Sequence, residues 1–231
     1  MVSSSSASLP SRLKAVVFDL DGTLIDSEPD LRVALNKLLV EDGRREVVRA
    51  EVIKMIGDGV PTLVERGYVA TGGLPDGPFE PVVERFHAFY EGHTADLSQP
   101  FPGVTEALIG LREAGLKLGV CTNKPEKPMR EILDIFGFSE FFSAVVGGDT
   151  LPGIRKPDGR HLAAVLDGLG VSADQAVMVG DNHNDVATAR NLKVPVIAVS
   201  FGYAHSAPSE LGADVLIDSF DDLIPALATV A

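Results

Sequence analysis

The sequence predicts an α/β fold: a parallel sheet with helices on both faces, and an all-helical segment inserted after the first strand. Short apolar runs that end at polar residues or glycine alternate with segments of helical periodicity through most of the 231 residues, a pattern typical of parallel sheets. Between about residues 27 and 98 only helical patterns occur. A crossover between parallel strands needs only about a dozen residues, so the surplus predicts an inserted helical domain.

The first predicted strand is Ala15 to Phe18, four apolar residues followed directly by Asp19. A continuous apolar run of this length is typical of a strand that is buried on both faces. Five further runs have the same form and lie at residues 116–121, 144–146, 176–179, 194–199 and 215–217. Helical spacing between these runs predicts helices over 104–114, 126–136, 157–169 and 184–192, with Pro157 at a first helical position.

The inserted segment contains four stretches of helical periodicity that glycines separate; they are residues 31–39, 47–56, 60–70 and 79–90. We therefore expect a core domain built from residues 13–26 and 99–231, an all-helical insertion over 27–98, and a disordered serine-rich tail over 1–12. The tail has neither the basic region nor the apolar region of a secretory signal.

The composition excludes several classes of protein. Hydrophobic residues make up 45% of the chain, enough for a sizeable core, and 20 Lys and Arg stand against 33 Asp and Glu, for a net charge of −13. This deficit of basic residues argues against binding to nucleic acid or to an anionic membrane surface. The single cysteine, Cys121, allows no internal disulfide. We expect a cytoplasmic protein, and the sequence leaves monomer and homodimer open.

Polar side chains gather where the predicted strands end, which is the edge at which open parallel sheets bind ligands. In chain order these residues are Asp19, Asp21, Thr122, Asn123, Lys156, Asp181 and Asp185. Four ionised carboxylates repel one another unless a cation lies among them, and oxygen ligands suit Mg²⁺. A phosphate group would then bridge the metal, the Lys156 ammonium and the Thr122 hydroxyl.

These residues stand in four motifs: Phe18-Asp-Leu-Asp-Gly-Thr-Leu24, Cys121-Thr-Asn123, Lys156-Pro157 and Gly180-Asp-Asn-His-Asn-Asp185. In this order they resemble the four motifs of the haloacid dehalogenase (HAD) superfamily of phosphatases. The helical insertion after the first motif is similar to the helical cap of that superfamily. The resemblance covers the chain from about Leu13 onward, and it implies a Rossmann-like core with an inserted cap that closes over the site.

The resemblance implies a role for each residue in catalysis. Asp19 would attack phosphorus and form an aspartyl-phosphate, and Asp21 would protonate the leaving oxygen and later activate water. Thr122 and Lys156 would hold the phosphoryl oxygens. A carboxylate is a competent covalent nucleophile, and a loose transition state gains most from positioning and charge neutralisation. An Asp at position 21 favours phosphoryl transfer, because dehalogenases of the superfamily lack it.

The resemblance also implies a magnesium site. Its ligands would be Asp19, Asp181 and, through its backbone carbonyl, Asp21. Asp185 would support the metal through water or through Lys156.

Softer features resemble bacterial phosphoglycolate phosphatases, which implies phosphoglycolate as the substrate. They include Met55-Ile-Gly57-Asp-Gly59 in the cap and Phe201-Gly-Tyr203 near the end of the chain. Two positions depart from relatives. Lys54 stands in the cap segment that reaches the substrate in relatives, and Asp158 follows the third motif where another proline is usual.

Each site residue also has a structural interpretation. Asp19 and Asp21 fit a turn after a strand, Asp185 fits the dipole at a helix start, and Lys156 fits a solvated position. The four motifs together favour the chemical role for these residues.

Other residues stay open or structural. For Asn123 and Lys54 the sequence leaves substrate binding and a local structural role open. We expect Cys121 to be a core residue and His183 a surface residue.

Other functions fit the same motifs. A phosphatase for a sugar phosphate or a nucleotide would share all of them. A phosphomutase would need a further acid or base in the cap, for which the sequence offers no clear candidate. A phosphonate hydrolase would use a cap lysine, for which Lys54 is the candidate. A non-catalytic binding protein would not need Asp19, Asp21, Lys156 and Asp181 together.

Overall fold

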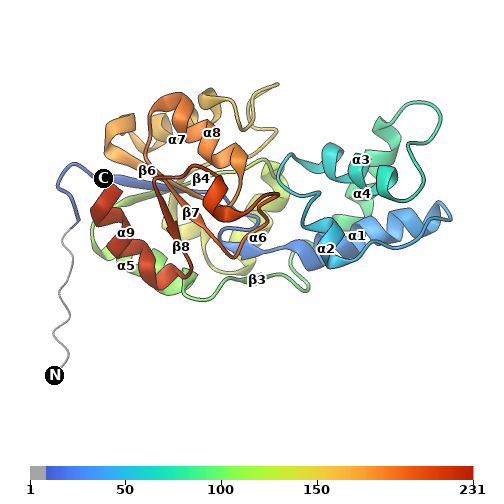
Figure 1. The fold of residues 1–231 in the computed structure, drawn as a ribbon, viewed down its shortest axis with the longest axis horizontal. Helices are drawn as coiled ribbons and strands as arrows, with labels where there is room; N and C mark the ends of the chain where they lie inside the picture. Colours follow the sequence, from blue (N-terminus) through green and yellow to red (C-terminus); the bar gives the residue numbers. More distant parts are fainter. Residues whose placement is uncertain (1–8, 231) are drawn as a thin grey trace.

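The computed structural model describes residues 9–230, so most of the tail predicted over residues 1–12 lies outside the described part. Six parallel strands form the main sheet in the order β5-β4-β1-β6-β7-β8 (Figure 1). Their bounds are β1 Ala15–Phe18, β4 Lys117–Cys121, β5 Phe142–Val146, β6 Ala176–Gly180, β7 Val196–Val199 and β8 Val215–Ile217. The α/β fold and its six strands are therefore confirmed.

The first strand lies in the middle of this sheet, between the two halves of the chain. Phe18 of β1 pairs with Val120 of β4 on one side and with Val179 of β6 on the other. The residues that follow these three strands consequently emerge at one level of the same edge. This is the point where the strand order reverses, and it is where open parallel sheets bind their ligands.

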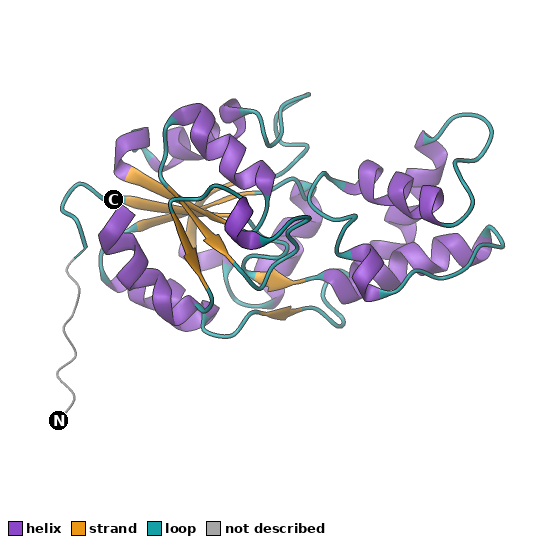
Figure 2. Ribbon diagram, in the orientation of Figure 1, coloured by secondary structure: helices purple, strands orange, loops and turns teal. Residues whose placement is uncertain are grey.

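Helices cover both faces of the sheet, as Figure 2 shows. On one face Val16 and Phe18 of β1 pack with α5, α6 and α9, whose bounds are Val104–Glu113, Glu126–Ile135 and Leu223–Val230. On the other face Ala15 and Val17 pack with α7 (Gly159–Leu169) and α8 (His183–Leu192). Alternate residues of a strand point to opposite faces, which is why a strand between two helical layers is apolar throughout.

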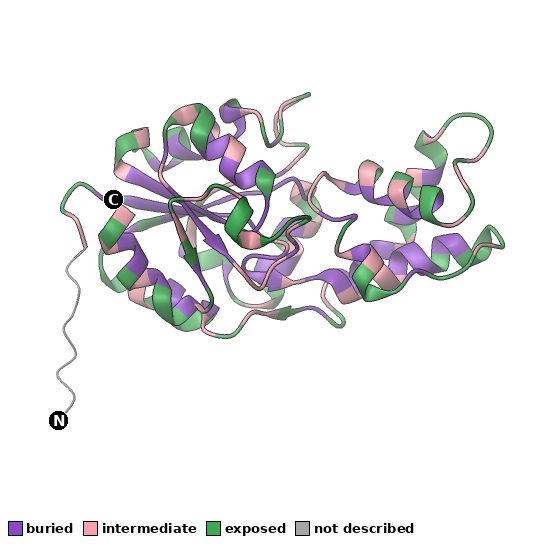
Figure 3. Cartoon of the chain, in the orientation of Figure 1, coloured by how far each residue is buried: buried purple, intermediate pink, exposed green. Residues whose placement is uncertain are grey.

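The inserted segment forms its own group of helices, apart from the sheet (Figure 1). Its helices are α1 Glu28–Glu41, α2 Arg49–Val52, α3 Val60–Ala70 and α4 Glu80–Tyr90, and we call residues 27–98 the cap. The cap has a separate apolar cluster that includes Leu35, Leu38, Tyr68 and Phe86. Figure 3 shows the buried inner sides of these helices and their exposed outer sides.

Two boundaries differ from the sequence prediction. The helix predicted over 47–56 is confined to Arg49–Val52. It begins after Val47 because the Asn36 side chain bonds both the N–H and the C=O of Val47, at 2.8 and 3.0 Å. The helix predicted from Pro157 begins only at Gly159. Its first turn is capped by Asp158, whose carboxylate accepts a hydrogen bond from the Arg160 N–H at 2.9 Å.

The two connections between core and cap run side by side. The short strands β2 (Ile25–Asp26) and β3 (Gln99–Pro100) pair antiparallel. The buried Asp30 carboxylate accepts hydrogen bonds from the backbone N–H groups of Leu97 and Ser98 and from the Ser98 hydroxyl, at 2.6 to 3.1 Å. This clamp joins the entry and the exit of the cap at one place.

The remaining elements are 3₁₀ turns at Ser139–Phe141, Ala173–Gln175, Pro208–Glu210 and Phe220–Asp222. Within residues 9–230, no helix combines the length and the apolar character that crossing a membrane requires.

Candidate active site

Three of the four predicted carboxylates meet at the carboxyl edge of the sheet. Asp19, Asp181 and Asp185 are buried, and each offers an oxygen within 4.8 Å of the others. Burial raises the pKa of Asp19 to about 6, against the opposing charge of Lys156. Burial and the negative charges of Asp185 and Asp19 raise the pKa of Asp181 well above its ordinary value. These carboxylates fit a hard divalent cation, which would remove the repulsion that the shifts express.

Gly22 lets Asp181 approach the turn that follows β1. The glycine has a φ of +85°, and a Cβ added there would lie 2.3 Å from Asp181 Oδ2. The same carboxylate accepts hydrogen bonds from the Tyr203 N–H at 2.6 Å and from the Thr23 hydroxyl at 3.2 Å. Asp181 is therefore fixed by two separate segments of the chain, the turn with Gly22 and Thr23 and the segment with Tyr203.

The Lys156 ammonium lies inside the cluster. Its Nζ is 2.8 Å from Asp19 Oδ1 and 2.6 Å from Asp185 Oδ1, and the side chain is almost entirely buried. Burial favours the neutral amine, but Asp185 and Asp19 outweigh it and raise the pKa of Lys156 above its ordinary value. Its role as an ordinary solvated lysine is thereby excluded, because a buried ammonium requires such partners.

Asp185 has both of the roles considered for it from the sequence: it stabilises the start of a helix, and it belongs to the charged cluster. Its Oδ2 accepts hydrogen bonds from the N–H groups of Asp181 and Asn182, at 3.0 and 3.1 Å, at the start of α8. Its Oδ1 binds Lys156 within the carboxylate cluster. One side chain thus stabilises the helix start and belongs to the charged centre.

Asn123 is a link between core and cap. Its amide nitrogen donates to the carbonyl oxygens of Lys156 and of Gly57, both at 3.0 Å, and its carbonyl oxygen accepts from the Lys156 N–H at 2.9 Å. Asn184 donates to Gly57 O at 3.2 Å and to Asp58 Oδ1 at 2.8 Å. The cap turn with Gly57 is therefore held by two amides of the core.

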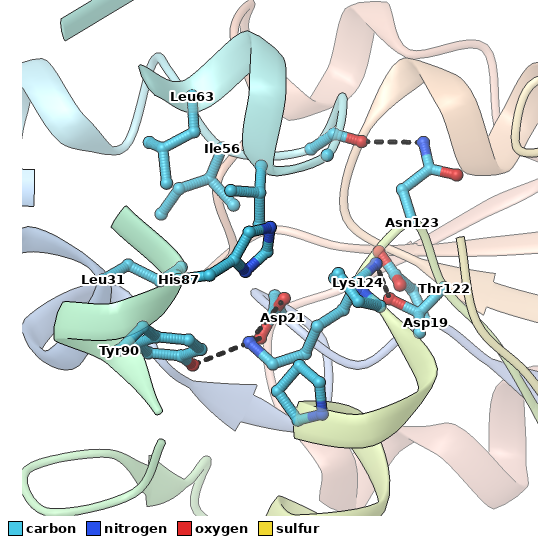
Figure 4. A pocket seen from close by; sticks show the side chains of 15 residues that line it. Asp19, Asp21, Leu31, Ile56, Leu63, His87, Tyr90, Thr122, Asn123 and Lys124 are labelled. Atoms are coloured by element: carbon cyan, nitrogen blue, oxygen red, sulfur yellow. Dashed lines mark hydrogen bonds and ion pairs between the residues drawn. The ribbon is translucent and has the colours of Figure 1, made fainter. Parts of the chain in front are cut away.

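A cavity lies between cap and core at this point (Figure 4). Asp19, Asp21 and Thr122 form its polar floor, and the cap side is mostly apolar, formed by Leu31, Ile56, Val60, Leu63, His87 and Tyr90. Thr122 thus lies where the sequence predicted a phosphate-binding hydroxyl. Lys54, for which the sequence left substrate binding open, is exposed and does not line the cavity. Ile56, two residues further along the chain, lines it instead.

The Asp21 side chain points away from the carboxylate cluster. Its Oδ1 lies 3.1 Å from Nζ of Lys124, which also donates to the Tyr90 hydroxyl at 2.8 Å. The metal contact that the resemblance implies for Asp21 is through its backbone carbonyl, and it stays a prediction. Neither Lys124 nor Tyr90 was predicted from the sequence to belong to the site; the available signal was a lysine directly after the second motif.

Two further expectations about single residues are confirmed. Cys121 is fully buried in the core, and His183 is exposed.

Comparisons with known proteins agree with this site. The family model described as haloacid dehalogenase-like hydrolase matches residues 16–199. The phosphoglycolate phosphatase of Caulobacter vibrioides is 45% identical over 216 residues, which is 93% of this chain and 91% of the relative. That of Rhodospirillum rubrum is also 45% identical, over 91% of this chain and 89% of the relative.

The solved structure of a protein described as a predicted phosphoglycolate phosphatase, from Haemophilus somnus, superimposes with a TM-score of 0.88. It is 30% identical in sequence and covers 94% of this chain and 98% of its own. From its fold, its motifs and these relatives, the chain belongs to the haloacid dehalogenase-like hydrolase family.

Proposed function

We propose that this chain is a Mg²⁺-dependent phosphomonoesterase that hydrolyses phosphoglycolate through an aspartyl-phosphate on Asp19. The observation that carries the proposal is the presence of two charge clusters at one cavity. Asp19 lies with the other buried carboxylates and Lys156, whereas Asp21 pairs separately with Lys124. In the first cluster, Asp19 is a nucleophile beside a site for a metal ion. In the second, the Asp21 carboxylate lies outside that metal site and is available as an acid and base.

The groups that would hold Mg²⁺ directly are the side chains of Asp19 and Asp181 and the backbone carbonyl of Asp21, and Asp185 would support the ion through Lys156. Three buried carboxylates with oxygens within 4.8 Å of one another support this assignment. When bound, the ion would stabilise negative charge on the phosphoryl oxygens.

The protein residues then account for both steps. An Asp19 oxygen forms a bond to phosphorus while the ester oxygen leaves, and Asp21 gives that oxygen its proton. In the second step Asp21 takes a proton from water as the water oxygen bonds to phosphorus, which breaks the bond to Asp19 and releases phosphate. Lys156, with Nζ 2.8 Å from Asp19, and the Thr122 hydroxyl hold the phosphoryl oxygens throughout.

Two observations support a small substrate. The relatives that match over nine-tenths of the chain are described as phosphoglycolate phosphatases. The cavity also holds only about 40 Å³ of space that the centre of a water molecule can reach, where one water needs about 10–15 Å³. With the cap in this position, a space of this size favours a small substrate.

Phosphate release from a panel of phosphorylated metabolites, with Mg²⁺ and with chelator, tests the proposal. We expect phosphoglycolate to be the best substrate, and turnover to require the metal. Asp19→Asn keeps the shape of the side chain but removes the nucleophile, so it should abolish release from every substrate while circular dichroism stays unchanged. Retained turnover in a folded Asp19→Asn variant would contradict the aspartyl-phosphate route.

The exposed position of Lys54 removes the one feature that favoured a phosphonate hydrolase. We further propose a cytoplasmic location, which the single, buried Cys121 supports.

A further inference from the structure

Lys124 is a buried lysine in the wall of the cavity. It follows β4 and is 5% exposed, and its Nζ lies between Asp21 of the core and Tyr90 of the cap (Figure 4). The Tyr90 hydroxyl donates its own proton toward the Thr94 carbonyl at 3.4 Å, so its oxygen is an acceptor for Lys124. An ammonium has three N–H donors. Nζ lies 3.1 and 3.3 Å from the two oxygens of the Asp21 carboxylate and 2.8 Å from the Tyr90 hydroxyl. A ligand that bonds this ammonium therefore shares it with the Asp21 carboxylate.

Lys124 also supplies the positive charge of this wall. Among the described residues that line the cavity it is the one lysine or arginine, beside the carboxylates of Asp19 and Asp21. Burial opposes its charge, but Asp21 and Tyr90 outweigh burial and raise the pKa of Lys124. Burial lowers the pKa of His87 on the cap side, so that imidazole is neutral at neutral pH. An anionic group that enters the cavity beyond the phosphoryl site therefore meets the Lys124 ammonium, which Asp21 also contacts.

The distances define which anion Lys124 can reach. In the proposed reaction Asp21 contacts the leaving oxygen of the ester, and Lys124 Nζ lies 3.1 Å beyond Asp21 Oδ1. Two hydrogen-bond lengths place Nζ within about 6 Å of that leaving oxygen. A carboxylate on the next carbon extends about 3 Å from the ester oxygen, and a hydrogen bond of about 2.8 Å closes the rest of the gap.

We propose that Lys124 is a specificity-determining residue that binds a carboxylate of the substrate. The enzyme then selects phosphomonoesters that carry a negative group one carbon beyond the ester oxygen. This inference rests on the proposed function, and phosphoglycolate has the required form. Tyr90 completes the subsite from the cap, so that the anion is bound where cap and core meet.

Binding of a non-hydrolysable pair tests the inference without turnover. 3-Phosphonopropionate has the shape and charge of phosphoglycolate, and 3-phosphonopropionamide lacks only the carboxylate charge. Hydrogen bonds to charged groups contribute enough for a preference of about 10–100-fold for the carboxylate, measured by calorimetry on the wild-type chain with Mg²⁺. Equal affinity for the two compounds overturns the inference, and this comparison requires no variant to fold.

Two variants locate the preference. Lys124→Met keeps the length of the side chain and should bring the two affinities to within about threefold of each other. Lys127 is an exposed lysine three residues further along the chain, and it pairs with Glu91. Lys127→Met removes the same charge as Lys124→Met but outside the subsite, so it should keep the full preference. A preference retained in a folded Lys124→Met variant assigns the carboxylate to another group and overturns the proposal.

Steady-state kinetics distinguish two roles of Lys124: binding the carboxylate of the substrate, and positioning the Asp21 side chain. The ratio of kcat/KM for phosphoglycolate over carbamoylmethyl phosphate, its neutral analogue, should fall in Lys124→Met by the factor that the affinities lose. Equal losses on both substrates, with the ratio unchanged, mean that Lys124 only holds Asp21 in place, which overturns the inference.

The two assays also separate this inference from the proposed function. Selective binding of the carboxylate without phosphate release supports the role of Lys124 and overturns the hydrolysis. Hydrolysis of both substrates at equal kcat/KM supports the phosphatase and overturns the role of Lys124.

Discussion

Single residues decide how closely the charged groups of this site approach one another. Asp19, Asp181 and Asp185 are crowded because Gly22 and Gly180 leave room for them: a Cβ at either glycine would lie 2.2 to 2.3 Å from a carboxylate atom. Both glycines stand within the first and the fourth motif of the sequence. Their purpose is visible only in three dimensions, since the clash at Gly22 is with a residue far along the chain.

Substitution of Gly22 by alanine should lower the stability of the protein by more than the strain of a positive φ alone would. Gly22 and Gly43 both have positive φ, at +85° and +70°, but an added Cβ at Gly43 has no atom within 4 Å. Gly43→Ala therefore measures the strain alone, about 1–2 kcal/mol. Gly22→Ala should lose more unfolding free energy in urea and also weaken Mg²⁺ binding in calorimetry. Equal losses in the two variants, with Mg²⁺ affinity intact, would disprove the clash.

The raised pKa of Asp19 makes the effect of Mg²⁺ depend on pH. The pKa of Asp19 in the folded protein is about 6, above the ordinary 3.8. Without metal, the contribution of Asp19 to the free energy of unfolding therefore falls as the pH rises from about 4 to about 6. Below about pH 6 Mg²⁺ must displace the proton, and its stabilising effect is then smaller. At fixed Mg²⁺, the rise in Tm over the chelated protein should be larger at about pH 7.5 than at about pH 5. Equal rises at both pH values would count against metal binding at Asp19.

At the scale of elements, the position of the cap depends on amides at the ends of core strands and helices. Asn184 in the first turn of α8 and Asn123 after β4 both bind the Gly57 carbonyl. These two hydrogen bonds hold the cap turn at the edge of the sheet where the carboxylates gather.

Loss of the Asn184 side chain should loosen this contact. Asn184→Ala removes two hydrogen bonds to the cap, at Gly57 and Asp58, worth about 1 kcal/mol each, and kcat/KM should fall by about tenfold or more. Asn191→Ala on the same helix removes a hydrogen bond to Pro157 O that does not involve the cap. It should leave steady-state kinetics near wild type. Similar kinetics for the two variants would show that the amide contact does not control the cap.

Elements were predictable from the sequence where a continuous apolar run or a helical spacing of apolar residues was clear. The buried strands appeared as apolar runs that end at a polar residue or glycine, and α3 to α8 appeared through their helical spacing. The two-residue strands β2 and β3 carry too little pattern, and α9 (Leu223–Val230) is apolar on most sides. Lys124 was missed because a lysine after a motif has the pattern of a solvated residue. Its partner Tyr90 comes from the cap, and only tertiary packing joins them.

For the whole molecule, the net charge of −13 opposes an anionic substrate at long range. The positive charge that the substrate requires is concentrated within the site, at Lys156, Lys124 and the expected metal. These local charges are buried, so salt screens them weakly.

Enzyme kinetics in different salt concentrations should reflect this arrangement. Raising ionic strength from about 0.05 to about 0.3 M should change kcat/KM by less than about threefold, because long-range steering contributes little. Removal of Mg²⁺ should abolish turnover at either salt concentration. A steep decrease with salt would mean that surface charges attract the substrate.

The clamp of Asp30 on Leu97 and Ser98 has a consequence for how such an enzyme can evolve. Both ends of the cap leave the core at one point, which is the arrangement in which inserted domains are exchanged most readily. Substitutions within the cap can then change which leaving groups fit, while the sheet edge and its carboxylates stay as they are. Selection can in this way alter the substrate range of the enzyme without rebuilding its chemistry.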